Sequence, residues 1–284
     1  MRDRVCLVTG ATNGIGYETA LGLARRGARV AIVGRDAEKA QACAARIRAA
    51  VPGAAVDAHV ADLSAQAEIR RLAGALRDAY PRLDVLVNNA GAIFDRRTLT
   101  IDGIERTWAL DHLGYVLLTL ELLDTLKASA GAGGKPRIVN VASAAHYRGH
   151  IDFDDIEGAR RYGAMRAYAQ AKLGNVLFTY ALARRLGGSG ITVNALHPGV
   201  INTGFARNTS GLFGTAWSLM RPFLSSPDKG AETSLHVASA PELDGVTGRY
   251  FSHRRPKPSS AESRDEAVQE RVWALSLRQV GRSG

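Results

Sequence analysis

Tyr168 and Lys172 are spaced so that both side chains could act in one reaction. Residues four apart on a helix project from the same face, so the phenol and the ammonium would lie one turn apart. A phenol loses its proton near pH ~10, and a cation about 4 Å away contributes roughly 4 kcal/mol at an effective dielectric near 20, or about three pKa units. The spacing therefore predicts a tyrosine of lowered pKa that exchanges a proton with an alcohol or a carbonyl, while the Ser143 hydroxyl holds the reacting oxygen.

A glycine-rich run near the start of the chain is typical of a nucleotide-binding loop. It lies between an apolar run and an amphipathic helical pattern, which favours a ligand site over a glycine-rich turn that binds nothing. Glycines at such a turn let the backbone approach a pyrophosphate, which then rests on the helix N-terminus. The spacing is GxxxGxG rather than GxGxxG, which selects a subset of dinucleotide-binding proteins. We predict that the cofactor contacts Gly10, Thr12, Asn13, Gly14, Ile15 and Gly16.

The end of the second predicted strand indicates which dinucleotide binds. A cofactor with a free 2′-hydroxyl usually meets an acidic residue at this position. Here Gly34 is followed by Arg35, whose guanidinium suits a 2′-phosphate, while Asp36 is placed to cap the next helix. The sequence therefore predicts NADP(H) rather than NAD(H).

The composition is that of an ordinary globular protein, with 284 residues of which 46% are apolar and 23% charged. Two cysteines, Cys6 and Cys43, are too few for a disulfide scaffold, and neither they nor the seven histidines show metal-binding spacing. The net charge of +10 is spread along the chain, without the basic stripe and interleaved aromatic residues that nucleic-acid binding needs. We expect no metal and no nucleic-acid partner, and a basic surface that attracts an anionic cofactor.

The apolar runs also bear on location. None reaches the ~18 residues that cross a bilayer. The glycine loop begins too early to leave room for a signal peptide, and free cysteines suit a reducing compartment. We therefore expect a cytoplasmic protein without a membrane span.

Short apolar runs alternate with longer helical patterns, which predicts a parallel sheet with crossover helices. The runs are nearly continuous in Val, Ile, Leu and Ala, as expected when helices cover both faces. The predicted fold class is α/β: a single Rossmann domain over 1–284, with a doubly wound seven-stranded parallel sheet flanked by helices. The expected strands are 5–8, 29–33, 55–60, 85–88, 137–141, 192–196 and 249–251. The expected helices include 37–50, 65–80, 104–128, 162–185 and one at about 262–279, with helix starts at Asp62 and Ser226.

Several motifs in a fixed order resemble those of the short-chain dehydrogenase/reductases over essentially the whole chain. They are the glycine run from Thr9 to Gly16, Asp62-Leu63, Asn88-Asn89-Ala90-Gly91, Ser143, Tyr168-x3-Lys172 and Pro198-Gly199. The stretches 111–119, 167–178, 245–251 and 271–276 are most similar to the retinol dehydrogenase and WW-domain oxidoreductase branch. The resemblance implies a nicotinamide-dependent enzyme that interconverts carbonyls and alcohols.

The resemblance also implies further site residues. It implies that Asp62 and Leu63 lie at the adenine, and that Asn89, Ala90 and Gly91 pass beside the adenosine ribose. Lys172 would bind the nicotinamide ribose and lower the pKa of Tyr168. The nicotinamide would be lined by Pro198, Gly199, Val200 and Thr203.

The chain departs from the family pattern at Asp111, where asparagine is usual. In the family this residue supports a proton-relay water, partly through its backbone carbonyl. A carboxylate would pair with Lys172 and weaken the effect of the lysine on Tyr168. We interpret Asp111 as a supporting catalytic residue, with a helix ion pair as the alternative.

A second departure is the long connection 145–167 between Ser143 and Tyr168. His146 and His150 lie in it, near where substrate must enter. No partner pattern marks a metal site or a catalytic triad, so we interpret both as ordinary loop histidines rather than catalytic groups.

The sequence indicates only the size and lipophilic character of the substrate. The segment 203–226 is rich in large apolar residues and glycines, and it corresponds to the family's substrate lid, which favours a bulky lipophilic alcohol or ketone. Two other functions stay open: a non-catalytic cofactor-binding interaction protein, and a nicotinamide-assisted epimerase or dehydratase. Monomer, dimer and tetramer also stay open, so a homo-oligomer is allowed.

Overall fold

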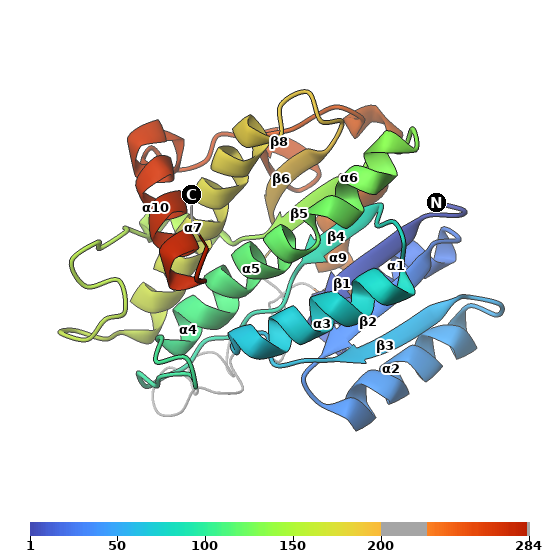
Figure 1. The fold of residues 1–284 in the computed structure, drawn as a ribbon, viewed down its shortest axis with the longest axis horizontal. Helices are drawn as coiled ribbons and strands as arrows, with labels where there is room; N and C mark the ends of the chain where they lie inside the picture. Colours follow the sequence, from blue (N-terminus) through green and yellow to red (C-terminus); the bar gives the residue numbers. More distant parts are fainter. Residues whose placement is uncertain (200–225, 283–284) are drawn as a thin grey trace.

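Eight strands form one sheet at the centre of the molecule (Figure 1). The computed structural model describes residues 1–199 and 226–282, and the strand order within them is β3-β2-β1-β4-β5-β6-β7-β8. The first seven strands are parallel: β1 Val5–Thr9, β2 Arg29–Gly34, β3 Val56–Val60, β4 Val85–Asn88, β5 Arg137–Val141, β6 Thr192–His197 and β7 Arg249–Ser252. Each lies where an apolar run predicted it, because helices cover both faces of the sheet.

The prediction of a seven-stranded sheet missed one strand. A further strand, β8 (Arg255–Lys257), pairs antiparallel with β7 at the sheet edge. His253 and Arg254 join the two strands with φ angles of 51° and 61°, the left-handed conformation that a tight hairpin turn requires. The sequence of β8 contains no apolar run that would predict a strand, because all three of its residues are exposed. It also contains Pro256, which is tolerated only at an edge.

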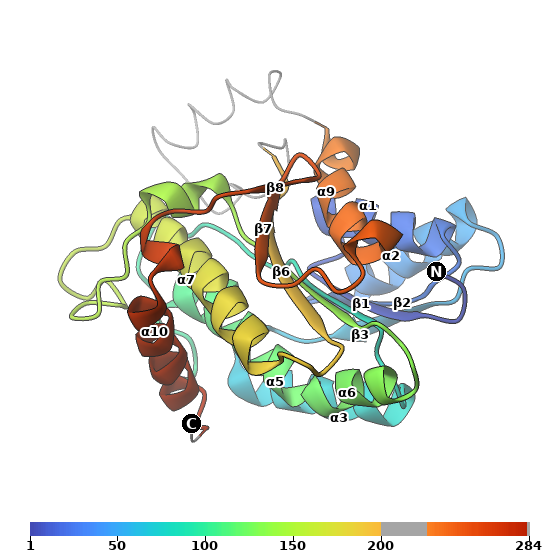
Figure 2. The same cartoon turned by 90° about the horizontal axis from the view of Figure 1, so that it is seen from above.

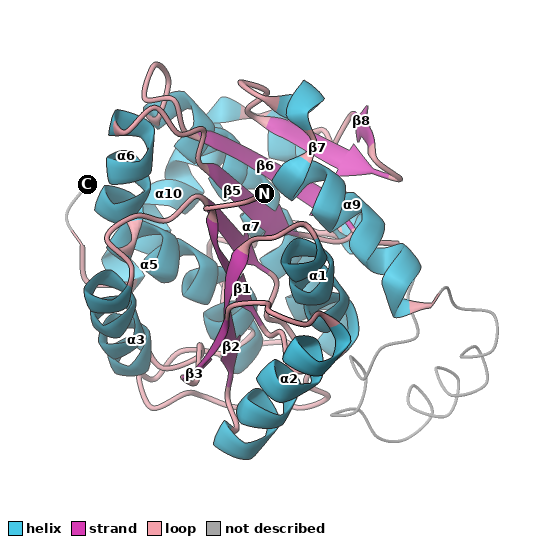
Figure 3. Cartoon of the chain, turned by 90° about the vertical axis from the view of Figure 1, so that its right-hand side faces the viewer, coloured by secondary structure: helices cyan, strands magenta, loops and turns pink. Residues whose placement is uncertain are grey.

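Helices cover the sheet in two layers (Figures 2 and 3). One layer holds α1 (Gly14–Arg25), α2 (Ala37–Ala50) and α9 (Pro227–Ser239). The other holds α3 (Gln66–Ala79), α5 (Gly114–Glu121), α6 (Leu123–Gly131) and α7 (Ala164–Arg185), with α10 (Glu266–Gln279) packed outside α7. Within the described ranges, no helix is both long and apolar enough to span a membrane.

The single helix expected over 104–128 is wrong in detail, because the segment is divided. It contains a short α4 (Arg106–Trp108), a π-helical turn η1 (Ala109–Leu113), α5 and α6. Glu105 caps α4 by accepting hydrogen bonds from the N–H groups of Thr107 and Trp108. Such π-helical turns often mark functional sites, and this one contains Asp111.

The strand order reverses beside β1, which pairs with β2 on one side and with β4 on the other. In open parallel sheets of this kind, ligands bind beyond the carboxyl ends of the strands at the reversal. The glycine run follows β1, and the run Asn88-Asn89-Ala90-Gly91 begins at the end of β4. The topology therefore brings two predicted cofactor segments to one crevice.

Candidate active site

A cavity of about 280 Å³ lies at this crevice. Its walls come from the carboxyl ends of β1, β2, β3 and β4 and from the segment that leads into α5. Most residues predicted to bind the cofactor line it together: Gly10, Thr12, Asn13, Gly14, Ile15, Gly16, Arg35, Asp62, Leu63, Asn89, Ala90 and Gly91. Residues from four separate motifs therefore face a single space.

The glycine loop has the shape of a cradle for an anion. Gly10 has a φ of +63°, and a Cβ there would lie 2.7 Å from the Cα of Ala90. A Cβ on Gly16 would lie 2.4 Å from the Gly10 carbonyl oxygen. Helix α1 begins at Gly14 without a side-chain cap and without an acidic residue in its first turn. Its exposed N–H groups and partial positive charge fit a pyrophosphate.

The end of β2 is arranged around Gly34. A Cβ there would lie 2.5 Å from Cγ2 of Thr12, so the strand and the glycine loop pack closely. Arg35 follows, exposed and lining the cavity. Asp36 accepts a hydrogen bond from the Lys39 N–H at 3.0 Å, which confirms the predicted cap of α2.

Asp62 does not start a helix directly. Its Oδ1 accepts hydrogen bonds from the Ser64 N–H at 2.9 Å and the Ser64 hydroxyl at 2.6 Å, which closes a turn before α3. Helix α3 begins at Gln66, whose N–H donates instead to Asp102 at 2.9 Å. The predicted helix start at Asp62 is therefore wrong, because Asp62 closes a turn and the acceptor at the start of α3 comes from a distant loop.

The Asn89 side chain joins the two loops of the crevice. Its Nδ2 donates to the carbonyl oxygens of Thr9 at 2.8 Å and Gly10 at 3.3 Å. The Thr9 hydroxyl in turn accepts from the backbone N–H of Asn89 and of Ala90. These bonds hold the glycine loop at a fixed distance from the residues that follow β4.

Ser143, Tyr168 and Lys172 lie near one another beside this crevice. Ser143 follows β5 and caps the 3-10 turn η2 (Ala144–Arg148), where its Oγ accepts from the Ala145 N–H at 3.2 Å. A hydrogen bond between the side chains of Ser143 and Tyr168 lowers the pKa of the phenol. Burial has the larger effect and raises the pKa of Tyr168 above its ordinary value.

The predicted lowering of the Tyr168 pKa by Lys172 is wrong in this structure. The Lys172 Nζ lies 5.5 Å from the centre of the Tyr168 ring and 3.1 Å from Oδ2 of Asp111. Both side chains of this ion pair are buried, with 4% and 0% of their surface exposed. The carboxylate offsets the ammonium, and its own negative charge contributes to raising the pKa of the tyrosine. The expected pairing of the Asp111 carboxylate with Lys172 is confirmed, while the supporting catalytic role of Asp111 stays a prediction.

Two hydrogen bonds hold Asp111 in addition to its ion pair with Lys172. Its Oδ1 accepts from the Ala92 N–H at 2.9 Å, and its backbone carbonyl accepts from Nδ2 of Asn175 at 2.7 Å. Burial raises the pKa of its carboxyl, while the positive charge of Lys172 opposes that rise. A Cβ on Gly91 would lie 2.9 Å from Oδ2 of Asp111 and 3.0 Å from the Lys172 Nζ. Because Gly91 also lines the cavity, the ion pair adjoins the dinucleotide crevice.

The two predicted nicotinamide residues that the structure describes lie outside this cavity. Pro198 and Gly199 follow β6 and are not part of the cavity lining. Val200, Thr203 and the lid expected at 203–226 fall in or overlap the range 200–225, which lies outside the described residues.

Phe94 and Arg106 are among the cavity residues that sequence reasoning missed. The Arg106 guanidinium lies 4.6 Å from the centre of the Phe94 ring, a cation–π contact that holds the cation at the cavity wall. No motif marks either residue. Only the folding of the segment after β4 against α4 brings them together.

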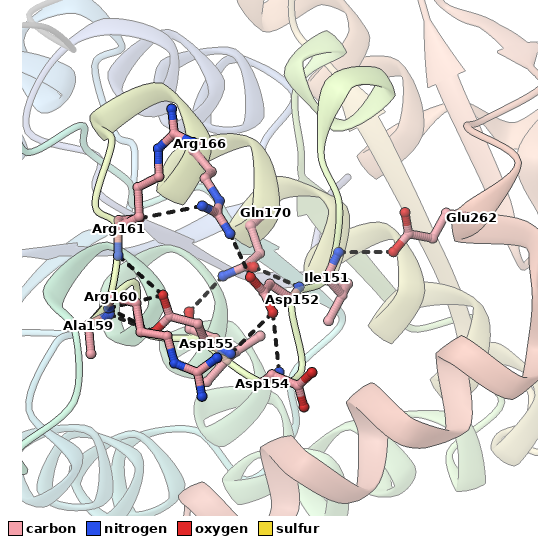
Figure 4. A network of polar contacts seen from close by, with 11 residues as sticks. Ile151, Asp152, Asp154, Asp155, Ala159, Arg160, Arg161, Arg166, Gln170 and Glu262 are labelled. Atoms are coloured by element: carbon pink, nitrogen blue, oxygen red, sulfur yellow. Dashed lines mark hydrogen bonds and ion pairs between the residues drawn. The ribbon is translucent and has the colours of Figure 1, made fainter.

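The long connection 145–167 is ordered by its own polar contacts (Figure 4). Oxygens of Asp155 accept from the N–H groups of residues 159–161. Asp152 pairs with Arg166 at 2.6 Å, and Gln170 bonds to the backbone of the connection at two points. Arg166 and Gln170 flank Tyr168 in sequence, so the connection is fixed to the turn of α7 that carries the tyrosine.

The two histidines of this connection have structural partners. His150 lies 3.0 Å from a carboxylate oxygen of Glu262, and His146 contacts backbone atoms of Ser143 and Ser260. Their interpretation as non-catalytic groups therefore agrees with their contacts.

Known proteins resemble this chain along nearly its whole length. Retinol dehydrogenase 13 of Homo sapiens is 44% identical, covering 98% of this chain and 85% of that protein. Retinol dehydrogenase 12 of Mus musculus is 42% identical (98% and 86%), and polyprenol dehydrogenase of Homo sapiens is 38% identical (98% and 86%).

Solved structures share the fold. A putative uncharacterized protein from Mycobacterium paratuberculosis superimposes with a TM-score of 0.79 at 32% identity, covering 99% of this chain and 95% of that one. The Pseudomonas aeruginosa RhlG/NADP active-site complex has a TM-score of 0.71 at 31% identity (88% and 94%). The family model for short chain dehydrogenase matches residues 4–211. The chain therefore belongs to the short chain dehydrogenase family, in its retinol dehydrogenase branch, and is an oxidoreductase that interconverts alcohol and carbonyl groups with a nicotinamide cofactor.

Proposed function

We propose that this protein is an NADP(H)-dependent oxidoreductase that acts on a bulky lipophilic alcohol or carbonyl compound, with Tyr168 as the general acid and base. One observation carries the proposal: the buried Tyr168, in contact with Ser143, lies beside a crevice shaped for a dinucleotide. Gly91 lies at both the cavity wall and the Asp111–Lys172 pair, so it joins the two parts of the site.

The residues divide the chemistry as follows. Bound NADPH would supply the hydride for reduction of the carbonyl carbon. Tyr168 donates its proton to the carbonyl oxygen, and Ser143 holds that oxygen by a hydrogen bond that strengthens as negative charge develops. Burial raises the Tyr168 pKa, so the phenol carries its proton at neutral pH, which suits reduction. Oxidation requires the tyrosinate, which Lys172 stabilises better when Asp111 does not offset its charge.

The preference for NADP(H) is supported by the end of β2. Arg35 lines the cavity directly after Gly34, where an acidic residue would favour NAD(H). A guanidinium binds a phosphate through charge-assisted hydrogen bonds. Three of the solved relatives hold NADP, those from Pseudomonas aeruginosa, Burkholderia cenocepacia and Beutenbergia cavernae, whereas one from Brucella melitensis holds NADH.

The lipophilic substrate is supported by the relatives and by the sequence. The curated relatives include dehydrogenases of retinol and of polyprenol, both long apolar alcohols. The segment 203–226, which the family likeness makes the substrate lid, is rich in Phe, Leu and Trp. We propose that apolar contacts to this segment select a bulky substrate.

Replacement of the catalytic phenol tests the proposal. Tyr168→Phe removes one hydroxyl, and we expect turnover of a panel of apolar ketones and alcohols, followed by reduced-nicotinamide absorbance, to fall by at least ~10²-fold. NADPH binding, followed by fluorescence titration, should change little. Tyr80→Phe is the matched control, because its hydroxyl donates to Asp57 near the amino end of β3, whereas the cavity lies at the carboxyl ends of the strands. Full activity of Tyr168→Phe would refute the assignment.

The same assay separates the other two functions. A cofactor-binding interaction protein would bind NADPH tightly without net oxidation or reduction of any substrate. A nicotinamide-assisted epimerase or dehydratase would convert substrate without net change in the reduced cofactor. Net turnover of cofactor, abolished in Tyr168→Phe, supports the oxidoreductase alone.

A further inference from the structure

The peptide group that follows Ser143 is held on both sides by histidine side chains. The Nδ1 of His146 lies 2.7 Å from the Ser143 carbonyl oxygen. The N–H of Ala144, at the other edge of the same peptide group, donates to Nδ1 of His197 at 3.1 Å. His146 comes from η2 itself, whereas His197 comes from the end of β6.

The partner of the second nitrogen fixes the tautomer of His146. Its Nε2 lies 3.2 Å from the backbone nitrogen of Ser260, and a backbone N–H can only donate. Nε2 must therefore accept, and the proton must lie on Nδ1, which donates to the Ser143 carbonyl. His197 takes the opposite tautomer, because its Nδ1 accepts from Ala144.

The surroundings of His146 keep the ring neutral and in place. The side chain is fully buried, and burial lowers the pKa of the imidazole below its ordinary value. Its ring centre lies 4.7 Å from that of Tyr250 and 4.0 Å from that of Tyr147. The Tyr147 hydroxyl donates to the Pro258 carbonyl at 2.6 Å, which fastens the segment before Ser260 to the same turn.

We infer that His146 is a positioning residue for Ser143. Its Nδ1–H, together with the backbone N–H of His146 that donates to the same carbonyl oxygen at 3.1 Å, fixes the Ser143 peptide plane. This plane sets the direction in which the Ser143 hydroxyl meets the reacting oxygen, while Ser260 fixes the tautomer of His146. The inference deepens the proposed function and rests on it. The C-terminal segment thus orients the catalytic serine through the contact between Ser260 and His146, which lie more than a hundred residues apart in sequence.

Two amide variants separate positioning from mere space filling. The Nδ2 of asparagine can replace the Nδ1–H of histidine, whereas the amide of glutamine reaches the position of Nε2. His146→Asn keeps the donor to Ser143 and loses the bond to Ser260, and His146→Gln does the reverse. We expect kcat within about threefold of wild type for His146→Asn and a roughly tenfold loss for His146→Gln, the loss of one hydrogen bond. KM for NADPH should change little in both.

A double-mutant cycle ties the effect to Ser143. In a Ser143→Ala background the enzyme has no Ser143 hydroxyl to orient, so His146→Gln should cause no further loss of kcat. Equal losses in the two amide variants, or an undiminished loss in the Ser143→Ala background, would overturn the inference while the proposed function stands. Absence of turnover in the wild-type enzyme would overturn the proposed function and the inference with it.

A measurement on the unaltered protein covers the case in which a variant does not fold. Long-range ¹H–¹⁵N spectra of protein labelled at histidine nitrogens distinguish the two neutral tautomers. We expect the Nδ1–H form for His146 and the Nε2–H form for His197. The Nε2–H form or a charged ring at His146 near neutral pH would overturn the inference.

Discussion

Asp111 and Lys172 form a buried ion pair one helical turn from Tyr168. Their separation of 3.1 Å makes the pair a nearly neutral unit, so the lysine acts on the phenol less than an isolated ammonium would. Burial raises the pKa of the Tyr168 phenol and the charge of Asp111 adds to that rise, so the phenol keeps its proton at neutral pH and can donate it.

Removal of the Asp111 charge should change the pH dependence of catalysis more than its rate. In Asp111→Asn the amide can still accept from the Ala92 N–H, and the backbone carbonyl keeps its bond to Asn175. Lys172 is then free to stabilise the tyrosinate, so the apparent pKa in the pH–rate profile of alcohol oxidation should fall. We expect kcat within about tenfold of wild type. A much larger loss with an unchanged apparent pKa would show that the carboxylate itself is needed.

Two arginines of the cavity should differ in what they recognise. Arg35→Ala should weaken NADPH binding by roughly ten- to a hundredfold, because a charge-assisted hydrogen bond contributes about 1.5–3 kcal/mol, while NADH binding changes little. Arg106→Ala is the control, since Arg106 lines the cavity on the α4 side, against Phe94. It should weaken both cofactors equally. Equal losses of NADPH and NADH in Arg35→Ala, by fluorescence titration, would remove the basis for the NADP(H) preference.

At the scale of elements, α7 carries Tyr168 and Lys172 and packs closely against the π-helical turn η1. Gly174 makes this approach close, because a Cβ there would lie 2.8 Å from Nδ1 of His112 and 3.1 Å from a ring carbon of Trp108. The close packing places Asn175 of α7 where it donates to the Asp111 carbonyl of η1.

A pair of glycine substitutions tests this packing. Alanine is the better helix former by about 0.8–1 kcal/mol. Gly74→Ala in α3 should therefore stabilise the protein by up to about that amount, since the added Cβ would meet nothing closer than Arg77 at 4.0 Å. Gly174→Ala should instead destabilise it by about 1–3 kcal/mol through overpacking. Urea unfolding measures both, and stabilisation by Gly174→Ala would contradict the close approach.

At the scale of the whole molecule, buried neutral histidines join distant parts of the chain. His112 in η1 contacts Asn175 of α7 at 3.2 Å and the Ser276 hydroxyl of α10 at 2.8 Å. Burial lowers the pKa of His112 to about 3 and that of His197 to about 4. These rings stay neutral in the folded protein at pH values where the unfolded chain protonates them.

Stability should therefore fall in mild acid. Because the folded pKa values lie below the unfolded value of about 6.5, the unfolded state binds more protons below that pH. Each histidine then lowers the free energy of unfolding by up to about 1.4 kcal/mol per pH unit as the pH falls from 6.5 toward its folded pKa. His112→Asn should show a shallower fall between pH 6.5 and 4.5, measured by urea unfolding. An equal slope in variant and wild type would show that His112 is not neutral in the fold.

The sequence by itself determined the features that depend on local spacing. The apolar runs of the seven parallel strands, the glycines from Gly10 to Gly16 and the Asp36 cap each depend on residues a few positions apart, and the structure has all of them. The i, i+4 spacing of Tyr168 and Lys172 likewise follows from the period of one helix.

Only the tertiary structure decided the features that depend on distant partners. Burial of Tyr168, with a smaller contribution from the charge of Asp111, raised the pKa that the spacing of Tyr168 and Lys172 had predicted to be lowered. Arg106 reaches the cavity wall through its contact with Phe94, and His146 takes its tautomer from Ser260. Hydrogen bonds need partners about 3 Å apart, and the attraction between charges weakens as their distance grows, so both depend on which side chains folding brings together. Short-range sequence patterns do not record those neighbours.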